Sequence, residues 1–281
     1  MAGLLFFAAP SAQAQSEYLT PFPAHHVAGN IYFVGSKGMA VYLITTPQGN
    51  ILINSGVNES PSMIKESIEK LGFKYSDTKI LLISHAHFDH DAGSAQIVRE
   101  TGAKYEVMDA DVPVVESGGK TDFFYGALAG EYLYPPVKVG RVLHDGSTVS
   151  LGGVVLTAHL TPGHTKGCTT WTLKVNDGSR TLDAVIVGSP NVNVGYVLVN
   201  NKLYPGIVQD YETTFRVLKA LPADLFLGAH GDYYGMEAKY AKLEAGGVNP
   251  FIDPAGYKAY VADRESAFRK ELARQQAGGK P

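Results

Sequence analysis

The densest group of chemically capable side chains lies between residues 85 and 90, where His85, His87, Asp89 and His90 occur within six positions. Neutral imidazoles and carboxylates are good ligands for zinc. Ligands must approach a tetrahedral ion from different directions, and a loop meets this need more easily than a helix face. The apolar run at residues 79–84 predicts a buried strand. We therefore expect a metal-binding loop that begins where this strand ends.

Two further histidines occur in similar local settings. His164 and His230 each follow a strand-like apolar run, and each is flanked by glycine, which permits a tight backbone turn. With the first cluster they supply five histidines and one aspartate, enough for two metal ions with three protein ligands each. Such a site keeps coordination positions open for water, as catalytic sites do. The predicted metal ligands are His85, His87, His164, Asp89, His90 and His230.

The other histidines call for a simpler interpretation. A single histidine near a strand end is more often a hydrogen-bonded polar residue than a ligand, and we interpret His25, His26, His144 and His159 in this way. That explanation does not extend to residues 85–90. Several imidazoles and a carboxylate packed together without a metal would be left unpaired or would repel one another.

The composition is that of an ordinary globular protein. The chain has 281 residues, of which 45% are hydrophobic and 18% charged, and this length fits one large α/β domain. Its formal net charge of −3 provides no basic field for nucleic acid. Cys168 is the only cysteine, so no intramolecular disulfide can form. We expect Cys168 to be a small buried residue rather than a metal ligand.

The first residues resemble an export signal. Residues 3–9 form an apolar run, and Ala12 and Ala14 follow it as an A-x-A cleavage pattern. The run is too short to span a bilayer, and no lysine or arginine precedes it. We interpret residues 1–14 as the remnant of a secretory signal, with an apolar tail as the alternative, and residues 15–281 as one metallo-hydrolase domain. This interpretation predicts a periplasmic or secreted protein.

Segments rich in β-branched and aromatic residues predict strands, and apolar residues at helical spacing predict helices. The predicted strands cover residues 30–34, 40–45, 49–54, 79–84, 139–143, 153–159, 169–175, 182–187 and 225–228. The predicted helices cover residues 61–71 with Ser60 as N-cap, 93–101 ending at Gly102, 210–221, 237–244 and 255–274. Periodicity alone leaves two α/β architectures open, namely two mixed sheets packed face to face with helices outside, or one doubly wound sheet.

The histidine segments decide between these architectures through a family resemblance. Residues 85–90 match the H-x-H-x-D-H signature of the metallo-β-lactamase superfamily, and the segments around His164 and His230 resemble its later ligand segments. The resemblance extends from about Ile31 to the final predicted helix. It implies the αββα sandwich, in which two mixed β-sheets pack face to face, helices lie outside, and the site occupies a groove at one edge of the sheets.

In detail the chain resembles the third subclass of class B β-lactamases. Residues 161–171 are especially similar to that subclass. The resemblance implies two Zn²⁺ ions. His85, His87 and His164 would hold the first ion, and Asp89, His90 and His230 would hold the second.

One position separates this subclass from other members of the superfamily. Relatives that act on lactones or thioesters have a metal-bridging aspartate after a strand, and other β-lactamase subclasses have a cysteine ligand there. In this chain Ser189 occupies the matching position, as in the third subclass. The chain departs from the usual pattern at Asn54, Pro190 and Asn191, and Ala223 stands where a disulfide cysteine is common.

The resemblance implies an antibiotic-resistance hydrolase for penicillins, cephalosporins and carbapenems, in which a zinc-bound hydroxide opens the lactam amide. The implied catalytic residues are Asp89, which also orients the nucleophile, together with His85, His87 and His164. Ser189 and Asn191 would bind the substrate carboxylate through hydrogen bonds. We predict that the groove is walled by Phe33, Phe124, Tyr125 and Tyr196, and that residues 122–125 form a loop leaning over the site.

Three other functions compete with this interpretation. The first is another hydrolase on the same fold, a lactonase or thioester hydrolase, against which Ser189 counts. The second is a zinc-binding scaffold without turnover, which the complete ligand set disfavours. The third is a nuclease, which the net charge disfavours. We expect a small-molecule β-lactam as the partner, no nucleic acid or membrane, and a monomer.

Overall fold

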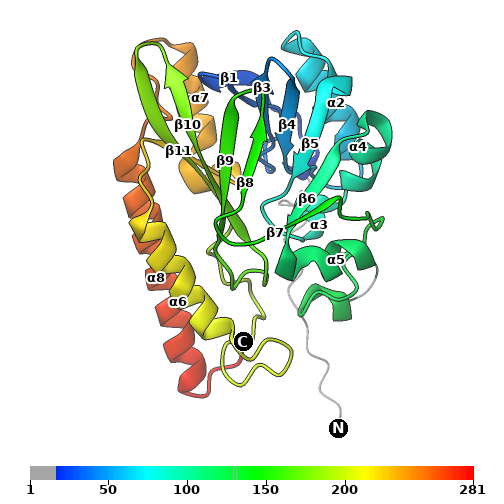
Figure 1. Ribbon diagram of the computed structural model, residues 1–281. Coiled ribbons are helices and arrows are strands. Elements are labelled where there is room, and N and C mark those ends of the chain that lie inside the picture. Colours follow the sequence, from blue (N-terminus) through cyan, green and yellow to red (C-terminus); the bar gives the residue numbers. More distant parts are fainter. Residues whose placement is uncertain (1–16, 129, 131) are drawn as a thin grey trace.

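The computed structural model describes residues 17–128, 130 and 132–281 (Figure 1). The predicted signal remnant at residues 1–14 lies outside the described residues. Two β-sheets pack face to face, and helices cover both outer surfaces (Figure 1). This arrangement confirms the αββα sandwich and excludes the doubly wound alternative. None of the helices within the described residues is long and apolar enough to span a membrane.

The first sheet contains seven strands in sequence order. They are β1 (His25–Ala28), β2 (Ile31–Phe33), β3 (Tyr42–Thr46), β4 (Gly49–Ile53), β5 (Thr78–Leu82), β6 (Lys104–Met108) and β7 (Arg141–Leu143). Strands β1 to β4 pair antiparallel, whereas β4 to β7 pair parallel. Nearly every residue of β4 and β5 is buried, because one face packs on the second sheet and the other on helices.

The second sheet contains five strands in the order β12-β11-β10-β9-β8. Their bounds are β8 (Thr148–Leu151), β9 (Val154–Leu160), β10 (Thr169–Asp177), β11 (Arg180–Val187) and β12 (Leu225–Gly228). Only β11 and β12 are parallel. The main core lies between the sheets and includes Trp171 of β10, whose indole N–H donates to the carbonyl of Ile83 at 3.1 Å. That bond connects the second sheet to the segment that leads into the histidine cluster.

The helices form the outer layers. Those beside the first sheet are α2 (Ser60–Lys70), α4 (Ser94–Thr101) and α5 (Val112–Ser117), and those beside the second sheet are α6 (Ile207–Ala220), α7 (Met236–Glu244) and α8 (Pro254–Gln276) (Figure 1). A second apolar cluster, which includes Ile64 of α2 and Ile97 of α4, fills the space between the first sheet and its helices. Gly102 ends α4 with a φ of 70°, as predicted.

Several local expectations need correction. The N-cap of α2 is Glu59, one residue before the expected Ser60, and it makes no side-chain capping bond. The strands β1, β6 and β8 and the helix α5 are not predicted from the sequence, because each is short and mixes polar with apolar residues. The motif at 85–90 is only partly a loop, since its second half forms the short helix α3 (Phe88–Asp91).

Candidate metal centre

All six predicted ligands lie at one end of the sandwich. His85 and His87 follow the end of β5, and Asp89 and His90 lie on α3. His164 lies in the connection between β9 and β10, and His230 follows β12. The turn of α3 lets neighbouring residues of one motif point in different directions. From the sequence we expect a loop to do this.

The first group consists of His85, His87 and His164, whose potential ligand atoms all lie within 4.8 Å of one another. Their exposed fractions are 1%, 4% and 5%. The ring centroids are 4.6–4.8 Å apart and the rings are steeply inclined to one another, so they do not stack. This arrangement suits three nitrogens that converge on one ion.

The second group is built around Asp89. Its Oδ2 lies 3.5 Å from Nε2 of His90 and 3.6 Å from Nε2 of His230, and these two nitrogens are 3.0 Å apart. His85 also falls within 4.8 Å of Asp89 and His90. Because His85 is already part of the first group, we assign His230 to the second group. The two groups are therefore contiguous, with His85 between them.

Burial keeps four imidazoles of the centre neutral, those of His85, His87, His90 and His164. Removal from water lowers the pKa of His85, His90 and His164 well below the usual value, and neighbouring histidines lower it further. Burial also lowers the pKa of His87 to about 3, against a smaller opposing effect of Asp89. Neutral imidazoles are the form that binds metal, so no proton has to be displaced at neutral pH.

The residues present fit a metal. Among the described residues, Nε2 of His85 is a buried nitrogen with no hydrogen-bond partner, and an unpaired buried polar atom is costly. Nδ1 of His164 donates to the carbonyl of Asn191 at 2.8 Å, and Nδ1 of His230 donates to the carbonyl of Gly38 at 3.0 Å. Both bonds fix the tautomer that leaves Nε2 free to ligate.

Comparison with known proteins identifies the family. The family model described as "Metallo-beta-lactamase superfamily" matches residues 39–230. The chain belongs to the metallo-β-lactamase superfamily. The match includes all six residues of the centre, from His85 to His230.

Solved structures place the chain near one subclass of this superfamily. It is similar to the native FEZ-1 metallo-beta-lactamase from Legionella gormanii, with 54% identity, a TM-score of 0.90, and coverage of 92% of this chain and 98% of that one. BJP-1, a subclass B3 metallo-beta-lactamase of Bradyrhizobium japonicum, is 41% identical, with a TM-score of 0.88 and coverage of 94% and 99%. The class B3 di-zinc metallo-beta-lactamase LRA-12 from an Alaskan soil metagenome is 32% identical, with a TM-score of 0.87 and coverage of 95% and 99%. The resemblance to the third subclass is thereby confirmed.

Asn54, one of the departures from the usual superfamily pattern, supports the centre from below. It adopts a left-handed conformation with a φ of 69°, which asparagine tolerates better than most residues. Its Oδ1 accepts from the backbone N–H of Ser84 at 2.8 Å, and its Nδ2 donates to the carbonyl of Ala40 at 3.1 Å. Asn54 follows β4, Ser84 follows β5 and Ala40 precedes β3, so this amide connects the ends of three strands.

Cys168 is fully buried, as expected. The Ser189 backbone N–H donates to its Sγ at 3.2 Å, and burial raises the pKa of the thiol to about 12. A thiol held protonated in this way is a poor ligand and a poor nucleophile.

Three of the four predicted wall residues lie beside the ligands. Tyr125 packs edge-on against His87, with ring centroids 4.8 Å apart, and Asp122 on the same loop has Oδ2 3.7 Å from Nε2 of His87. The hydroxyl of Tyr196 donates to the carbonyl of His164 at 2.8 Å, and Phe124 packs on Tyr196. The loop at 122–125 therefore leans over the centre, as expected.

Phe33 is a correction to the predicted walls. It lies in the core between the sheets, against Phe22, His25 and Tyr42, and does not line the site. Phe33 pairs with Tyr42 at the ligand end of its strand β2, but its side chain points into the core between the sheets, and residue type does not show that direction.

Ser189 and Asn191 converge on a residue that the sequence does not single out. The Ser189 hydroxyl is 3.1 Å from the hydroxyl of Tyr233, and Nδ2 of Asn191 donates to the same hydroxyl at 3.0 Å. Ser189 is only 1% exposed. Nη1 of Arg264 on α8 lies 3.5 Å from Oδ1 of Asn191. The only sequence signal for Tyr233 is its position three residues after His230.

The remaining histidines have partners that need no metal. His25 stacks on Phe33 and Phe251, and its Nδ1 donates to the carbonyl of Pro23. The other three have polar partners as well, namely Gly29 for His26, Asp109 for His144 and Thr172 for His159. The simpler interpretation of these four residues is confirmed.

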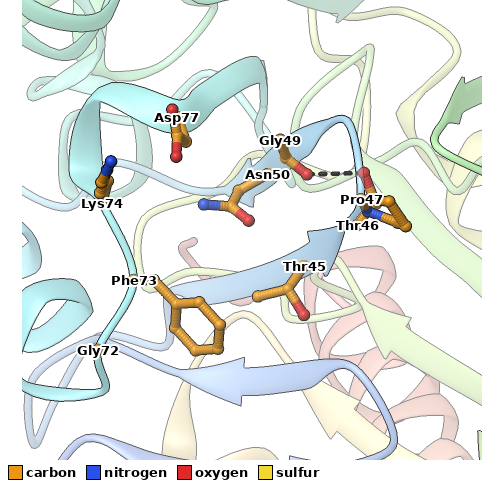
Figure 2. A pocket seen from close by; sticks show the side chains of 9 residues that line it. All are labelled: Thr45, Thr46, Pro47, Gly49, Asn50, Gly72, Phe73, Lys74 and Asp77. Carbon is orange, nitrogen blue, oxygen red and sulfur yellow. Dashed lines mark hydrogen bonds between the residues drawn. The ribbon is translucent and has the colours of Figure 1, made fainter.

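A separate cavity of about 470 Å³ lies at the opposite end of the sandwich. It is formed by the β3–β4 turn and the segment after α2, and Figure 2 shows Asn50, Phe73, Lys74 and Asp77 around it. The Thr46 hydroxyl donates to the carbonyl of Gly49 across the turn at 2.7 Å (Figure 2). This cavity contains no histidine or cysteine and has no connection with the metal centre.

Proposed function

We propose that this protein is a zinc-dependent β-lactamase of the subclass B3 type, which hydrolyses the lactam amide of penicillins, cephalosporins and carbapenems. The observation that carries the proposal is the convergence of six buried or half-buried ligands in two contiguous groups. The identity of 54% to a metallo-β-lactamase over nearly the whole of that protein supports the same conclusion. In a bacterial host such an enzyme would confer antibiotic resistance.

We assign His85, His87 and His164 to a first zinc ion, and Asp89, His90 and His230 to a second. When bound, zinc supplies Lewis acidity toward the lactam amide and lowers the pKa of water at the site. Asp89 faces the space shared by the two groups, where its carboxylate accepts a hydrogen bond from the attacking water and orients it. Asp89, His85, His87 and His164 are therefore the proposed catalytic residues.

Substrate binding is proposed for the side of the centre beside His230. Ser189 would contribute to binding the substrate carboxylate together with Tyr233, whose hydroxyl is 3.1 Å from its own. Asn191 and Arg264 would then contact the carboxylate of a β-lactam, directly or through water. Tyr125 and the rest of the 122–125 loop would shield the opposite side from bulk water.

Two alternatives on the same fold have less support. Ser189 stands at the position where hydrolases of lactones and thioesters have a bridging aspartate, and the solved structures compared above are β-lactamases. A zinc-binding scaffold would not need a site that leaves Asp89 and His230 partly accessible. We also propose that the protein is exported, on the A-x-A pattern at Ala12 and Ala14, and that it is a monomer.

The test is hydrolysis of a carbapenem and a cephalosporin by the purified protein. Three samples are compared: zinc-replete enzyme, enzyme treated with a chelator, and chelated enzyme to which zinc has been restored. We expect turnover that the chelator abolishes and zinc restores. Absence of lactam turnover in zinc-replete protein, together with turnover of a lactone, thioester or phosphodiester in the same preparation, would contradict the proposal.

A further inference from the structure

One buried carboxylate outside the ligand set lies between the two segments that hold the first metal group. Asp111 ends a short 3₁₀ turn (Asp109–Asp111) that follows β6, and it is 1% exposed. Neither the ligand motif nor the proposed mechanism uses it. A buried carboxylate is costly unless its oxygens are paired, so its partners indicate what it does.

The partners of Asp111 come from both ligand segments. Its Oδ2 accepts from the backbone N–H of Ala86 at 3.0 Å and from the hydroxyl of Thr165 at 2.8 Å. Its Oδ1 accepts from the backbone N–H of Gly167 at 2.8 Å. Ala86 lies between His85 and His87, and Thr165 directly follows His164. Each ligand of the first group is therefore next to a residue that Asp111 holds.

The close packing at Gly167 is an independent sign of the same arrangement. A Cβ at that position would lie 2.6 Å from the backbone nitrogen of Asp111 and 2.7 Å from its Cγ. These distances are too short for any side chain, so the segment after His164 is pressed directly against the carboxylate. Glycine is needed here because of the close approach of the backbone and not because of a turn.

The second metal group is held by other contacts. The Ser55 hydroxyl donates to the carbonyl of His90 at 3.0 Å, and His230 is oriented by the carbonyl of Gly38. None of the hydrogen bonds that Asp111 makes reaches the loop of His230. Asp111 holds both segments of the first group but only one segment of the second, so a change at Asp111 should weaken the first group more than the second.

We propose that Asp111 is a positioning residue that holds the two ligand segments in register and so sets chiefly the metal affinity of the His85, His87 and His164 group. The inference rests on the proposed function only in its assignment of these residues as metal ligands. Its physical basis is that hydrogen bonds to an ionised acceptor are roughly twice as strong as those between neutral groups. Because all three bonds end on one carboxylate, they fix the distance between the segment of Ala86 and the segment of Thr165 and Gly167.

The test is the variant Asp111→Asn, which keeps size and shape. An amide has one oxygen and one NH₂ group, so in either orientation its NH₂ faces a donor of Gly167 or the donors of Ala86 and Thr165. Stepwise binding of Zn²⁺ and Co²⁺ to the full-length metal-free protein is measured by competition with a chromophoric chelator. We expect the affinity of the first site to fall about 10- to 100-fold and that of the second to change less than about threefold.

The matched control is Asp109→Asn. Asp109 lies on the same 3₁₀ turn, but its carboxylate is largely exposed and pairs with His144, away from the ligand segments. Both metal affinities should match those of the wild type. A milder variant, Thr165→Val, removes one of the three donors without placing a donor against a donor, and should weaken the first site by less than Asp111→Asn.

Three results would overturn the inference. They are equal weakening of both sites in Asp111→Asn, unchanged affinity at both sites, and, if that variant does not fold, a Thr165→Val protein with an unchanged first site. The measurement needs no substrate. If the protein lacks lactam turnover but shows the unequal weakening, the proposed function fails and the role of Asp111 stands. The Co²⁺ absorption spectrum reports ligand geometry directly and would not change for a purely structural residue.

Discussion

The two halves of the metal centre are built differently. The histidines of the first group are almost completely buried and come from two segments that a shared carboxylate connects. In the second group the side chains of Asp89 and His230 are 11% and 19% exposed. His230 is oriented by a single backbone carbonyl. One half is thus enclosed and supported from both of its segments, and the other is partly open to solvent.

This difference has a functional meaning. A buried, prearranged ligand set binds its ion tightly because little has to move or be desolvated on binding. A partly exposed set exchanges its ion more readily and leaves room for substrate beside it. We therefore expect the first site to retain metal under conditions in which the second is partly empty, and substrate to approach from the side of His230.

The largest effect is expected when the enclosed half is broken. His164→Ala, or His87→Ala, removes a first-group ligand and leaves only two imidazoles for the ion. We expect loss of about one metal equivalent and a fall in turnover greater than the roughly 10- to 100-fold that loss of an outer partner causes. Metal content by mass spectrometry and steady-state kinetics test this. Normal activity in either variant would show that the ligand assignment is wrong.

A change in the open half should be more selective. His230→Ala should weaken the second site while the first keeps its metal, because the two groups share no support from the β12 loop. Turnover should fall less than in His164→Ala and should recover partly at high zinc concentration. Stepwise metal titration is the measurement, with His144→Ala as a control, since His144 is exposed and pairs with Asp109. Loss of both ions from His230→Ala would contradict the independence of the two halves.

The open half can also be probed through substrate binding. Arg264→Ala removes the cation beside Asn191 and should raise KM for a carboxylate-bearing lactam by up to about tenfold, with a smaller change in kcat. The effect is limited because Arg264 is partly exposed and also pairs with Asp263. Arg269→Ala on the same helix is the control, since Arg269 pairs with Glu265 on the outer surface. Equal changes of KM in both variants would show that Arg264 does not contact the substrate.

The ligands themselves can be predicted from the sequence because they combine a local motif with strand ends. His85, His87, Asp89 and His90 are close in sequence, and His164 and His230 follow apolar runs that end at glycine-flanked positions. His85 and His230 follow the ends of β5 and β12, which each pair parallel with a neighbour, and His164 follows β9; these strand ends lie at one end of the sandwich, so the six residues meet.

The supporting residues cannot be found in the same way. Asp111 and Tyr233 are single polar residues in segments without periodicity, and Arg264 is one of several charged residues on a predicted helix. Their partners lie 25 to 73 positions away in the chain. Only the packing of distant segments brings them to the centre. The short helix α3 is likewise missed, because four residues are too few to show a helical period.

The smallest expected effect concerns His25, a buried histidine outside the ligand set, and the pH dependence of the stability that it contributes. Burial lowers the pKa of His25 below its usual 6.5, and its Nε2 is buried without a partner beside aromatic rings. Because the folded pKa is the lower one, the unfolded chain binds the proton more readily. The stability contributed by the neutral ring is complete above about pH 6.5 and is lost as the pH falls through the lower, folded pKa.

His25→Phe keeps the aromatic stack and removes the titrating group. We expect the variant to be less stable than the wild type at pH 8, by about 1 kcal/mol, because the bond to the Pro23 carbonyl is lost. The deficit should shrink as the pH falls below 6.5. Protonation of His25 in the unfolded chain then lowers the free energy of unfolding of the wild type but not of the variant. Denaturant unfolding at several pH values, with zinc in constant excess, measures the difference. A deficit that is independent of pH would mean that His25 does not change its protonation on unfolding.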